Sequence, residues 1–266
     1  MATIHPNTCH HVSFGNSNPK QSMKHWLNYF EHNRDHRHAI PWCDKINIAP
    51  HVEKPFIRSL QRFQIGESGE GRHLRVAANA TGDIAYIKAL DLFIKEEQEH
   101  ARLMGEILKR LGAPLLTSHW SDGCFILLRR LFRLNEELMV LLTPEIIAKR
   151  YFRVAHDAVD DASVKAVCAQ ILHDEEGHVA FHIDYLRRAF ANYSIVRRAL
   201  LRGTWRVLFR LSALVVILDH RSFLNACGVS TAQFWWDCEL MFDDVAAQIF
   251  AFAPSGVPAP AVISAA

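Results

Sequence analysis

The chain has 266 residues, of which 50% are hydrophobic and 22% are charged, as in folded globular proteins and unlike disordered ones. Its formal net charge of +2 gives no global attraction to nucleic acid, and we expect no nucleic-acid partner. The six cysteines form no C-x-x-C pair, and the polar, histidine-rich N-terminus does not resemble a signal peptide. We therefore expect a cytoplasmic protein with reduced thiols and no transmembrane segment.

Four segments are expected along the chain. Residues 1–51 predict an irregular N-terminal segment with one short helix near 22–32. Residues 52–190 carry the longest helical patterns and form the expected core. Residues 191–253 predict accessory helices, and the Pro/Ala-rich residues 254–266 predict a flexible tail. Strand-like alternation is absent from the sequence, so the expected fold class is all-α.

The core segment predicts four helices. Gly82 suits a helix end, and Asp83 suits the cap of the helix that follows. Pro144 is expected to interrupt or kink the third helix. The expected helices cover about 54–79, 83–111, a third that ends near 159, and 162–190. Further along, Gly228 to Thr231 predicts a stop and a restart between two accessory helices.

One polar spacing occurs twice in these helices. Each copy has a Glu, a second Glu thirty positions later and a His three positions after that. The two copies are Glu67, Glu97, His100 and Glu145, Glu175, His178. Since positions i and i+3 share one face of a helix, each Glu-x-x-His can direct a carboxylate and an imidazole at one point.

These polar residues stand where apolar residues would continue the buried side of each helix. Glu97, for example, occupies the missing step between Ile94 and Ala101. Burying an unpaired carboxylate costs several kcal/mol, and no Lys or Arg occupies the centres of these faces. Two metal ions would balance the charge. The simpler explanation is that these are surface glutamates on helices whose buried face is wrongly assigned.

A third Glu-x-x-His, Glu70 to His73, has no partner of matching spacing. Glu67 is therefore the preferred ligand, and Glu70 is kept as an outer or substrate-side carboxylate. Glycines cluster around Glu67, at positions 66, 69 and 71. They leave room beside the metals or distort the helix locally, or else they allow close packing against an aromatic ring; the sequence does not separate these explanations.

The two copies resemble the ferritin-like di-iron carboxylate superfamily, whose oxygenase members carry Glu-x28-37-Asp/Glu-Glu-x-x-His twice. The resemblance covers residues 52–190 and implies a four-helix bundle that holds two iron ions, Fe/Fe or Mn/Fe. It implies that Glu67 and Glu145 are terminal ligands and that His100 and His178 each bind one metal. Glu97 and Glu175 would bridge the two ions. Oxygen-rich ligation also favours iron or manganese over zinc.

The resemblance also implies roles for residues that contact the metal ligands rather than the metals. Glu96 and Asp174, each four residues before a histidine, would orient His100 and His178 respectively. His182 lies one turn beyond His178. It could be an additional ligand of the kind used by the p-aminobenzoate N-oxygenase branch, or a hydrogen-bonded core or outer histidine.

The function that the resemblance implies is a non-haem di-iron or Mn/Fe oxygenase or oxidase. Such an enzyme uses O2 and an electron donor to oxidise a small or carrier-bound organic substrate. The alternative is a ferroxidase or iron-storage protein, although the segments outside the bundle would obstruct the tiling of a storage shell. A third hypothesis, a non-catalytic bundle with a degenerate site, is disfavoured because both Glu-x-x-His copies are complete. A homodimer is compatible with the sequence.

Beyond the core, arginines recur every four residues on the first accessory helix. Such a basic stripe could dock an acidic carrier, an anionic ligand or a membrane surface, or it could pair with nearby acids. The four positions are Arg198, Arg202, Arg206 and Arg210.

Overall fold

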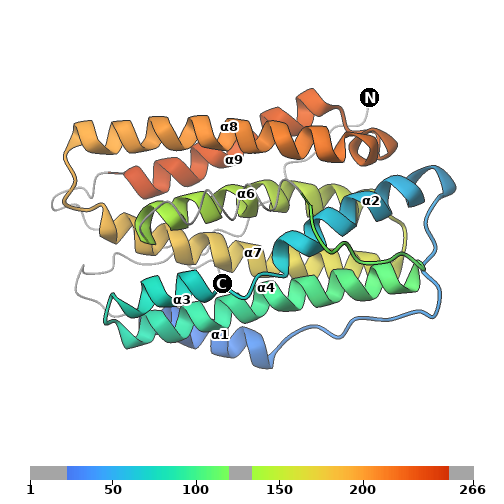
Figure 1. Ribbon diagram of the computed structural model, residues 1–266, viewed down its shortest axis with the longest axis horizontal. Coiled ribbons are helices and arrows are strands. Elements are labelled where there is room, and N and C mark those ends of the chain that lie inside the picture. The colour runs from blue at the N-terminus through green and yellow to red at the C-terminus, as the bar shows by residue number, and fades with distance from the viewer. Residues whose placement is uncertain (1–22, 120–133, 252–266) are drawn as a thin grey trace, which may run out of the picture.

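The computed structural model describes residues 23–119 and 134–251, and these residues form helices and connecting loops without any strand (Figure 1). The all-α prediction is therefore confirmed for the described part of the chain. The helices are α1 (Lys24–Asp35), α2 (Pro50–Glu67), α3 (Arg72–Asn79), α4 (Ile84–Arg110), α6 (Leu134–Ala158), α7 (Ala162–Ala189), α8 (Ile195–Ala226) and α9 (Thr231–Phe250).

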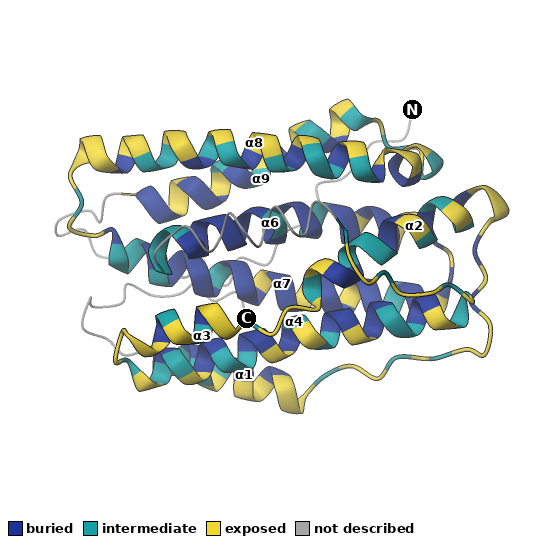
Figure 2. Ribbon diagram, viewed as in Figure 1, coloured by how far each residue is buried: buried dark blue, intermediate teal, exposed yellow. Residues whose placement is uncertain are grey.

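The helices are arranged in layers around one continuous hydrophobic core (Figures 1 and 2). In the central layer α6 packs along α7, and α7 also contacts α4. On one side α4 packs against α1, α2 and α3. On the other side α8 and α9 pack against each other and cover α6, while α8 also reaches α2 and α9 reaches α7. As a result α2, α4, α6 and α7 face a common interior.

Side-chain caps define the starts of the long helices as the sequence predicts. The Asp83 carboxylate accepts hydrogen bonds from two backbone N–H groups in the first turn of α4. Asp161 does the same at the start of α7. After Gly228, which has a φ of 72°, Ser230 caps α9. The predicted stop and restart between the two accessory helices is therefore confirmed.

The first core helix is the main correction to the sequence prediction. The expected continuous helix over about 54–79 is divided into α2, which begins earlier at Pro50, and α3. Gly71 has a φ of 62°, which interrupts the helix, and a Cβ there would overlap the side chain of Ile94. The structure therefore shows a local break and close packing against an aliphatic side chain. Glu67 becomes the last residue of α2.

Pro144 does not interrupt α6, contrary to the sequence expectation. The helix runs from Leu134 to Ala158, and nearly all of its residues from Glu137 to Ile147 are buried. Proline removes one backbone hydrogen bond, but packing on several sides stabilises the helical path. The neighbouring Thr143 donates to the carbonyl of Met139 and accepts from Trp205 Nε1 at 3.1 Å.

The described part of the N-terminal segment contains one short helix, as the sequence suggests. The expected short helix is α1, whose Trp26 and Phe30 side chains are completely buried. The irregular part at 1–22 and the tail from 254 onward lie outside the described residues. Among the described helices, none combines the length and the apolarity that crossing a membrane would require.

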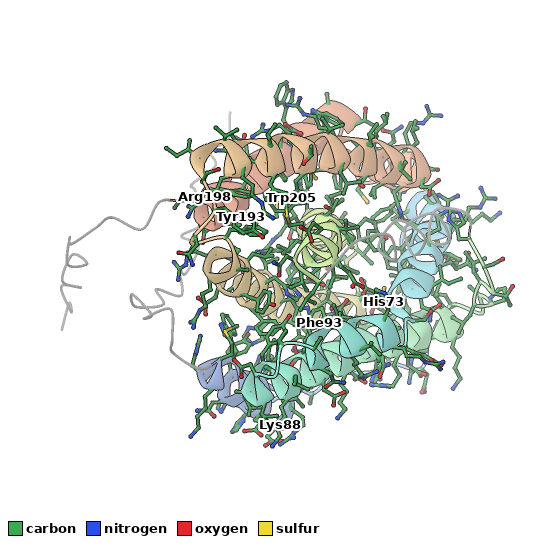
Figure 3. The ribbon with its side chains drawn as sticks, turned by 60° about the vertical axis from the view of Figure 1, so that its left-hand side comes forward. His73, Lys88, Phe93, Tyr193, Arg198 and Trp205 are labelled. Carbon is green, nitrogen blue, oxygen red and sulfur yellow. The ribbon has the colours of Figure 1, made fainter. Side chains whose placement is uncertain are left out.

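The arginine stripe of α8 faces α9. Arg202 and Arg206 pair with Asp243, and Arg210 Nη2 lies 2.9 Å from Glu239 Oε2. Arg198 is buried beside Tyr193, where its guanidinium donates to backbone carbonyls at the start of α8 and the end of α9 (Figure 3). Pairing with nearby acids is therefore the explanation that the structure supports for this stripe.

Candidate metal centre

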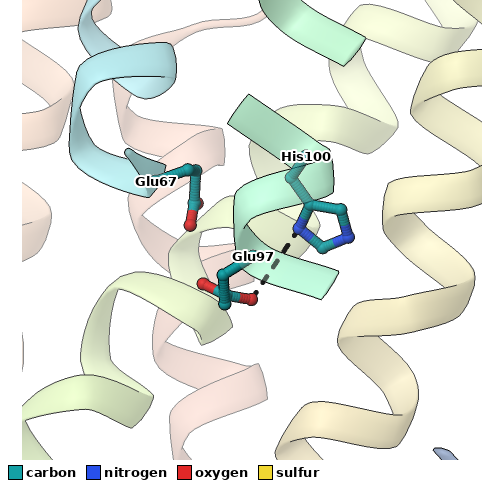
Figure 4. A group of neighbouring side chains, drawn as sticks. All are labelled: Glu67, Glu97 and His100. Carbon is teal, nitrogen blue, oxygen red and sulfur yellow. Dashed lines mark ion pairs between the residues drawn. The ribbon is translucent and has the colours of Figure 1, made fainter. Parts of the chain in front are cut away.

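The first Glu/His group lies where the end of α2 meets the middle of α4. Ligand atoms of Glu67, Glu97 and His100 all lie within 4.8 Å of one another (Figure 4). His100 Nδ1 is 3.7 Å from Glu97 Oε1, and His100 is completely buried. Glu67 is only half-buried, because the chain leaves the helix directly after it.

The second group shares a residue with the first. Glu97, Glu175 and His178 also offer ligand atoms within 4.8 Å of one another. His178 Nδ1 lies 2.9 Å from Glu97 Oε1 and 3.8 Å from Glu175 Oε2. Glu97 therefore stands between two carboxylate–imidazole groups, one on each side.

Glu145 and His182 extend the cluster on the α6 side. Glu145 is buried, and its Oε1 lies 3.5 Å from His182 Nε2. Neither residue belongs to the two tight groups, but the negative charge of Glu145 raises the pKa of both Glu67 and Glu175. The four predicted glutamates and both predicted Glu-x-x-His histidines thus converge on one interior region.

The electrostatics of the cluster show an excess of negative charge. Burial raises the pKa of Glu67 well above its usual value, and repulsion from Glu97 adds to this. Burial also raises the pKa of Glu175 to about 7; His178 opposes the shift, whereas Glu97 and Glu145 reinforce it. Burial would raise the pKa of Glu97 as well, but the contacts with His178 and Glu67 and the charge of His100 together outweigh it and lower that pKa to about 2. A bound cation would relieve this repulsion.

Several atoms that face the centre have no hydrogen-bond partner. Among them are His100 Nδ1 and Glu175 Oε2, both buried; His178 Nδ1 and Glu97 Oε1 are also buried and lie 2.9 Å apart as an ion pair. A buried polar atom without a partner costs about 1–3 kcal/mol. These nitrogens and carboxylate oxygens are also metal-ligand atoms that point toward one region. The buried Glu and His groups therefore fit a metal ion.

The outer nitrogen of each histidine is held by a carboxylate from the opposite helix. His100 Nε2 on α4 lies 2.9 Å from Asp174 Oδ2 on α7. His178 Nε2 on α7 lies 2.9 Å from Glu96 Oε2 on α4. Glu96 and Asp174 were expected to orient the histidines of their own helices, and this pairing is wrong. The exchange is possible because α4 and α7 pack directly against each other at this level.

The helix α1 and the loop that follows it contribute residues that were not predicted from the sequence. Asn33 Nδ2 donates to Glu96 Oε1 at 2.7 Å and to Asp174 Oδ1 at 2.9 Å. Arg37 Nη2 donates to Asp174 Oδ2 at 2.5 Å. Burial would raise the pKa of Asp174, but His100 and Arg37 hold it well below its usual range. A signal was present, since Trp26, Phe30 and Asn33 follow a helical spacing of four and three.

Gly177, within the second Glu-x-x-His, allows α1 to approach closely. A Cβ at this position would overlap the hydroxyl and ring of Tyr29. Burial raises the pKa of Tyr29 to about 12, and the neighbouring Glu96 and Asp174 add to the shift while His178 opposes it. The Tyr29 ring therefore closes the side of the cluster that faces α1.

His182 lies in a mainly aromatic environment. Its ring centroid is 4.8 Å from that of Phe93 and 5.1 Å from that of Phe181. Burial lowers its pKa to about 3, and the positive charge of His178 adds to the shift. Both of its ring nitrogens are buried without a hydrogen-bond partner. The role of His182 stays a prediction, either as an additional ligand or as a core or outer histidine beside Glu145.

Glu70 is not brought to the cluster. Its side chain is exposed and pairs with Arg72 in the break between α2 and α3. His73 instead lies on α3, where its Nδ1 is 3.0 Å from the buried Glu137 of α6. The third Glu-x-x-His is thus divided by the left-handed backbone at Gly71 and does not form one ligand face.

Comparison with known proteins adds no relative. No family model matches the chain, and no match was found among curated proteins or solved structures. What the fold and the site establish is therefore a class: an all-helical protein whose buried Glu and His groups could hold a metal ion.

Proposed function

We propose that this chain is a ferritin-like, non-haem di-iron protein that uses O2 to oxidise an organic substrate. In this proposal helices α2, α4, α6 and α7 would be the four-helix bundle of that superfamily, and their packing around one interior supports this assignment. The observation that carries the proposal is the position of Glu97, which lies between two carboxylate–imidazole groups. A site for one ion needs only one such group, whereas a pair of ions shares a central carboxylate.

In this proposal Glu67 and His100 would hold one ion, Glu175 and His178 would hold the other, and Glu97 would be available to both. Glu145 of α6 and His182 of α7 would lie beside the ions on the side that faces α6. Two bound iron ions would supply the electrons needed to reduce O2, and Fe/Fe is preferred to Mn/Fe.

The protein side of the mechanism is the orientation of two imidazoles. Asp174 and Glu96 accept the Nε2 protons of His100 and His178, so that both Nδ1 atoms keep a lone pair directed at the centre. Arg37 offsets part of the negative charge that these outer carboxylates add. A purely structural core would not need two buried histidines whose Nδ1 lone pairs are held toward a common centre.

The surroundings of the site suit reactions that exclude water. Phe93 lies against His178 and His182, with ring centroids 4.6 and 4.8 Å away. The opposite side, at Glu67, is less enclosed. Gly66 and Gly69 are exposed there, and a Cβ on either would meet nothing within 4 Å. This is the side from which O2 and a small or carrier-bound substrate would approach.

Reconstitution under anaerobic conditions tests the proposal. We expect wild-type chain loaded with Fe(II) to retain about two iron ions and to consume O2 in stoichiometric proportion. Glu97→Ala should lose both properties, whereas Glu70→Ala, which alters an exposed carboxylate of the neighbouring loop, should keep them. Failure of the wild-type chain to retain iron or manganese would remove the proposal. The ferroxidase and storage alternative predicts instead a large closed shell on sizing and a mineral product without any organic substrate.

A further inference from the structure

An exposed apolar face runs along almost the whole length of α8. Six large aliphatic side chains on it are between 46% and 69% exposed. They are Val196, Leu200, Val207, Leu211, Leu214 and Leu218. We call this set, together with Gly203, the α8 stripe. It spans 23 residues, and its ends are about 33 Å apart at 1.5 Å per residue; it lies on the outer edge of the α8–α9 layer (Figure 2).

The α8 stripe is symmetric about its centre. Its members stand four, seven and eleven positions on either side of Val207. An antiparallel copy centred at the same residue would place Leu200 against Leu214 of the second copy, and Val196 against its Leu218. The eleven-residue period is close to the natural pitch of a straight α-helix, so two such helices can stay in contact along their full length.

Gly203 fits this arrangement. It faces Leu211 of the second copy in the antiparallel register, and a Cβ on Gly203 would meet nothing within 4 Å in one chain. A glycine in a helix interior is unfavourable relative to alanine, so it calls for a packing reason. The open surface over Gly203 provides a hole for a leucine from the partner.

Charge favours a second copy over an anionic surface. The arginines that border the stripe on the α9 side are already paired, Arg202 and Arg206 with Asp243, and Arg210 with Glu239. They therefore offer little net charge to an acidic carrier or an anionic membrane. What remains along the stripe is apolar, and its natural partner is another apolar face.

We propose that two copies of this chain associate through the α8 stripe, with the α8 helices antiparallel and a twofold axis at Val207. Such isologous contacts are the commonest form of homodimer. Taking on the order of 100 Å² for a fully exposed aliphatic side chain and scaling it by the exposed fractions of 46% to 69%, the six residues would bury roughly 700 Å² over both copies. This area is below that of stable specific interfaces, so we expect a weak dimer that dissociates on dilution to about micromolar concentration.

Cysteine cross-linking tests the register. Val207→Cys should form a disulfide-linked dimer under mild oxidation, because the axis brings the two thiols together. Leu200→Cys alone should not, since its copies lie far apart, but mixing it with Leu214→Cys should produce a linked pair. The parent chain, which keeps its exposed Cys43, measures background linkage. Linkage by Leu200→Cys alone would mean a parallel arrangement and would overturn the proposal, as would no linkage above background in any sample.

Sedimentation of the full chain supplies the second test. Leu211→Asp should yield monomers with unchanged helix content, while Val76→Asp, which places the same charge at an equally exposed valine of α3, should leave the dimer intact. Gly203→Leu should weaken association roughly tenfold by overfilling the hole, and adding Leu211→Ala should restore it. A monomeric wild-type chain at about 100 µM, or equal behaviour of the two Asp variants, would contradict the proposal.

Discussion

The protein has two clusters with buried histidines, and they differ in whether the ring nitrogens of those histidines have hydrogen-bond partners. Between α2, α6 and α8, His220 Nδ1 lies 2.6 Å from Ser59 Oγ, which in turn lies 2.8 Å from Tyr151 OH. No side-chain atom of this trio is buried without a partner. In the metal cluster, by contrast, the inward Nδ1 of His100 has no hydrogen-bond partner, and that of His178 faces only the crowded carboxylates of Glu97 and Glu175.

The comparison shows that burial of a histidine is not by itself a sign of a ligand. The His220 trio satisfies its own hydrogen bonds, as buried polar groups ordinarily do. The metal cluster leaves several donor atoms directed at one point and crowds carboxylates around them. This arrangement is unfavourable for a protein without a cation and favourable for one that binds it.

The strongest test of the difference removes a carboxylate from the cluster. Glu175→Gln should abolish metal retention, yet it should stabilise the metal-free chain by roughly 1–3 kcal/mol, because it removes charge from a repulsive buried group. Metal analysis and urea unfolding in the presence of a chelator measure the two effects. Changing Ser59 to Ala is the matched control: it should destabilise the chain without altering the metal content.

The exchanged outer carboxylates predict a smaller effect with a specific pattern. Asp174→Asn and Glu96→Gln should each weaken iron binding by about 10–100-fold, since the outer partner of a ligand histidine is altered. A double-mutant cycle in metal affinity should show coupling of Asp174 with His100 rather than with His178. Coupling of Asp174 with His178, on the same helix, would contradict the pairing of each histidine with a carboxylate of the opposite helix.

The close contact of α1 with α7 predicts an effect on stability. Gly177→Ala should destabilise the chain by about 1–3 kcal/mol, because the added methyl overlaps the ring of Tyr29. Gly105→Ala, in the interior of α4 and with only an ordinary 3.9 Å contact to Leu115, should be neutral or stabilising by up to about 1 kcal/mol. Chemical denaturation of both variants tests this contrast, and equal effects would contradict it.

The His220 trio predicts an effect on the pH dependence of stability. Burial lowers the pKa of His220 to about 3, and the charge of Arg62 adds to the shift, whereas the unfolded chain titrates near 6.5. The unfolded state therefore binds a proton that the folded state does not, and stability falls as the pH drops from 6.5 toward 3. The slope from this group is at most about 1.4 kcal/mol per pH unit. His220→Gln should be less stable at pH 8 and show a shallower decline below 6.5.

The helical elements and the convergence of the ligands were predictable from the sequence. Their apolar spacing has a clear helical period, and Asp83 and Asp161 mark helix starts through local hydrogen bonds. The two equal spacings brought Glu97 and Glu175 to the same level because α4 and α7 are neighbours. Local chemistry and periodicity were sufficient for these features.

Other features depend on contacts between helices and could not be read from one helix at a time. The break before α3 depends on Gly71 fitting against Ile94. The exchange of Glu96 and Asp174 depends on how α4 and α7 are rotated toward each other. The hydrogen bonds of Asn33 and Arg37 to the outer carboxylates depend on the packing of α1 against α4 and α7. Asn33 is a polar residue in the apolar face of α1, which is the same kind of sequence signal as Glu97 in the apolar face of α4.

The central claim is that Glu97 lies between two metal ions, and X-ray absorption at the iron K-edge of anaerobically loaded chain tests it most directly. The account predicts nitrogen and oxygen ligands only, together with an iron–iron vector at about 3.5–4 Å that disappears in Glu97→Ala. Iron that is retained as a single isolated ion, or a vector that survives the loss of Glu97, would contradict the account.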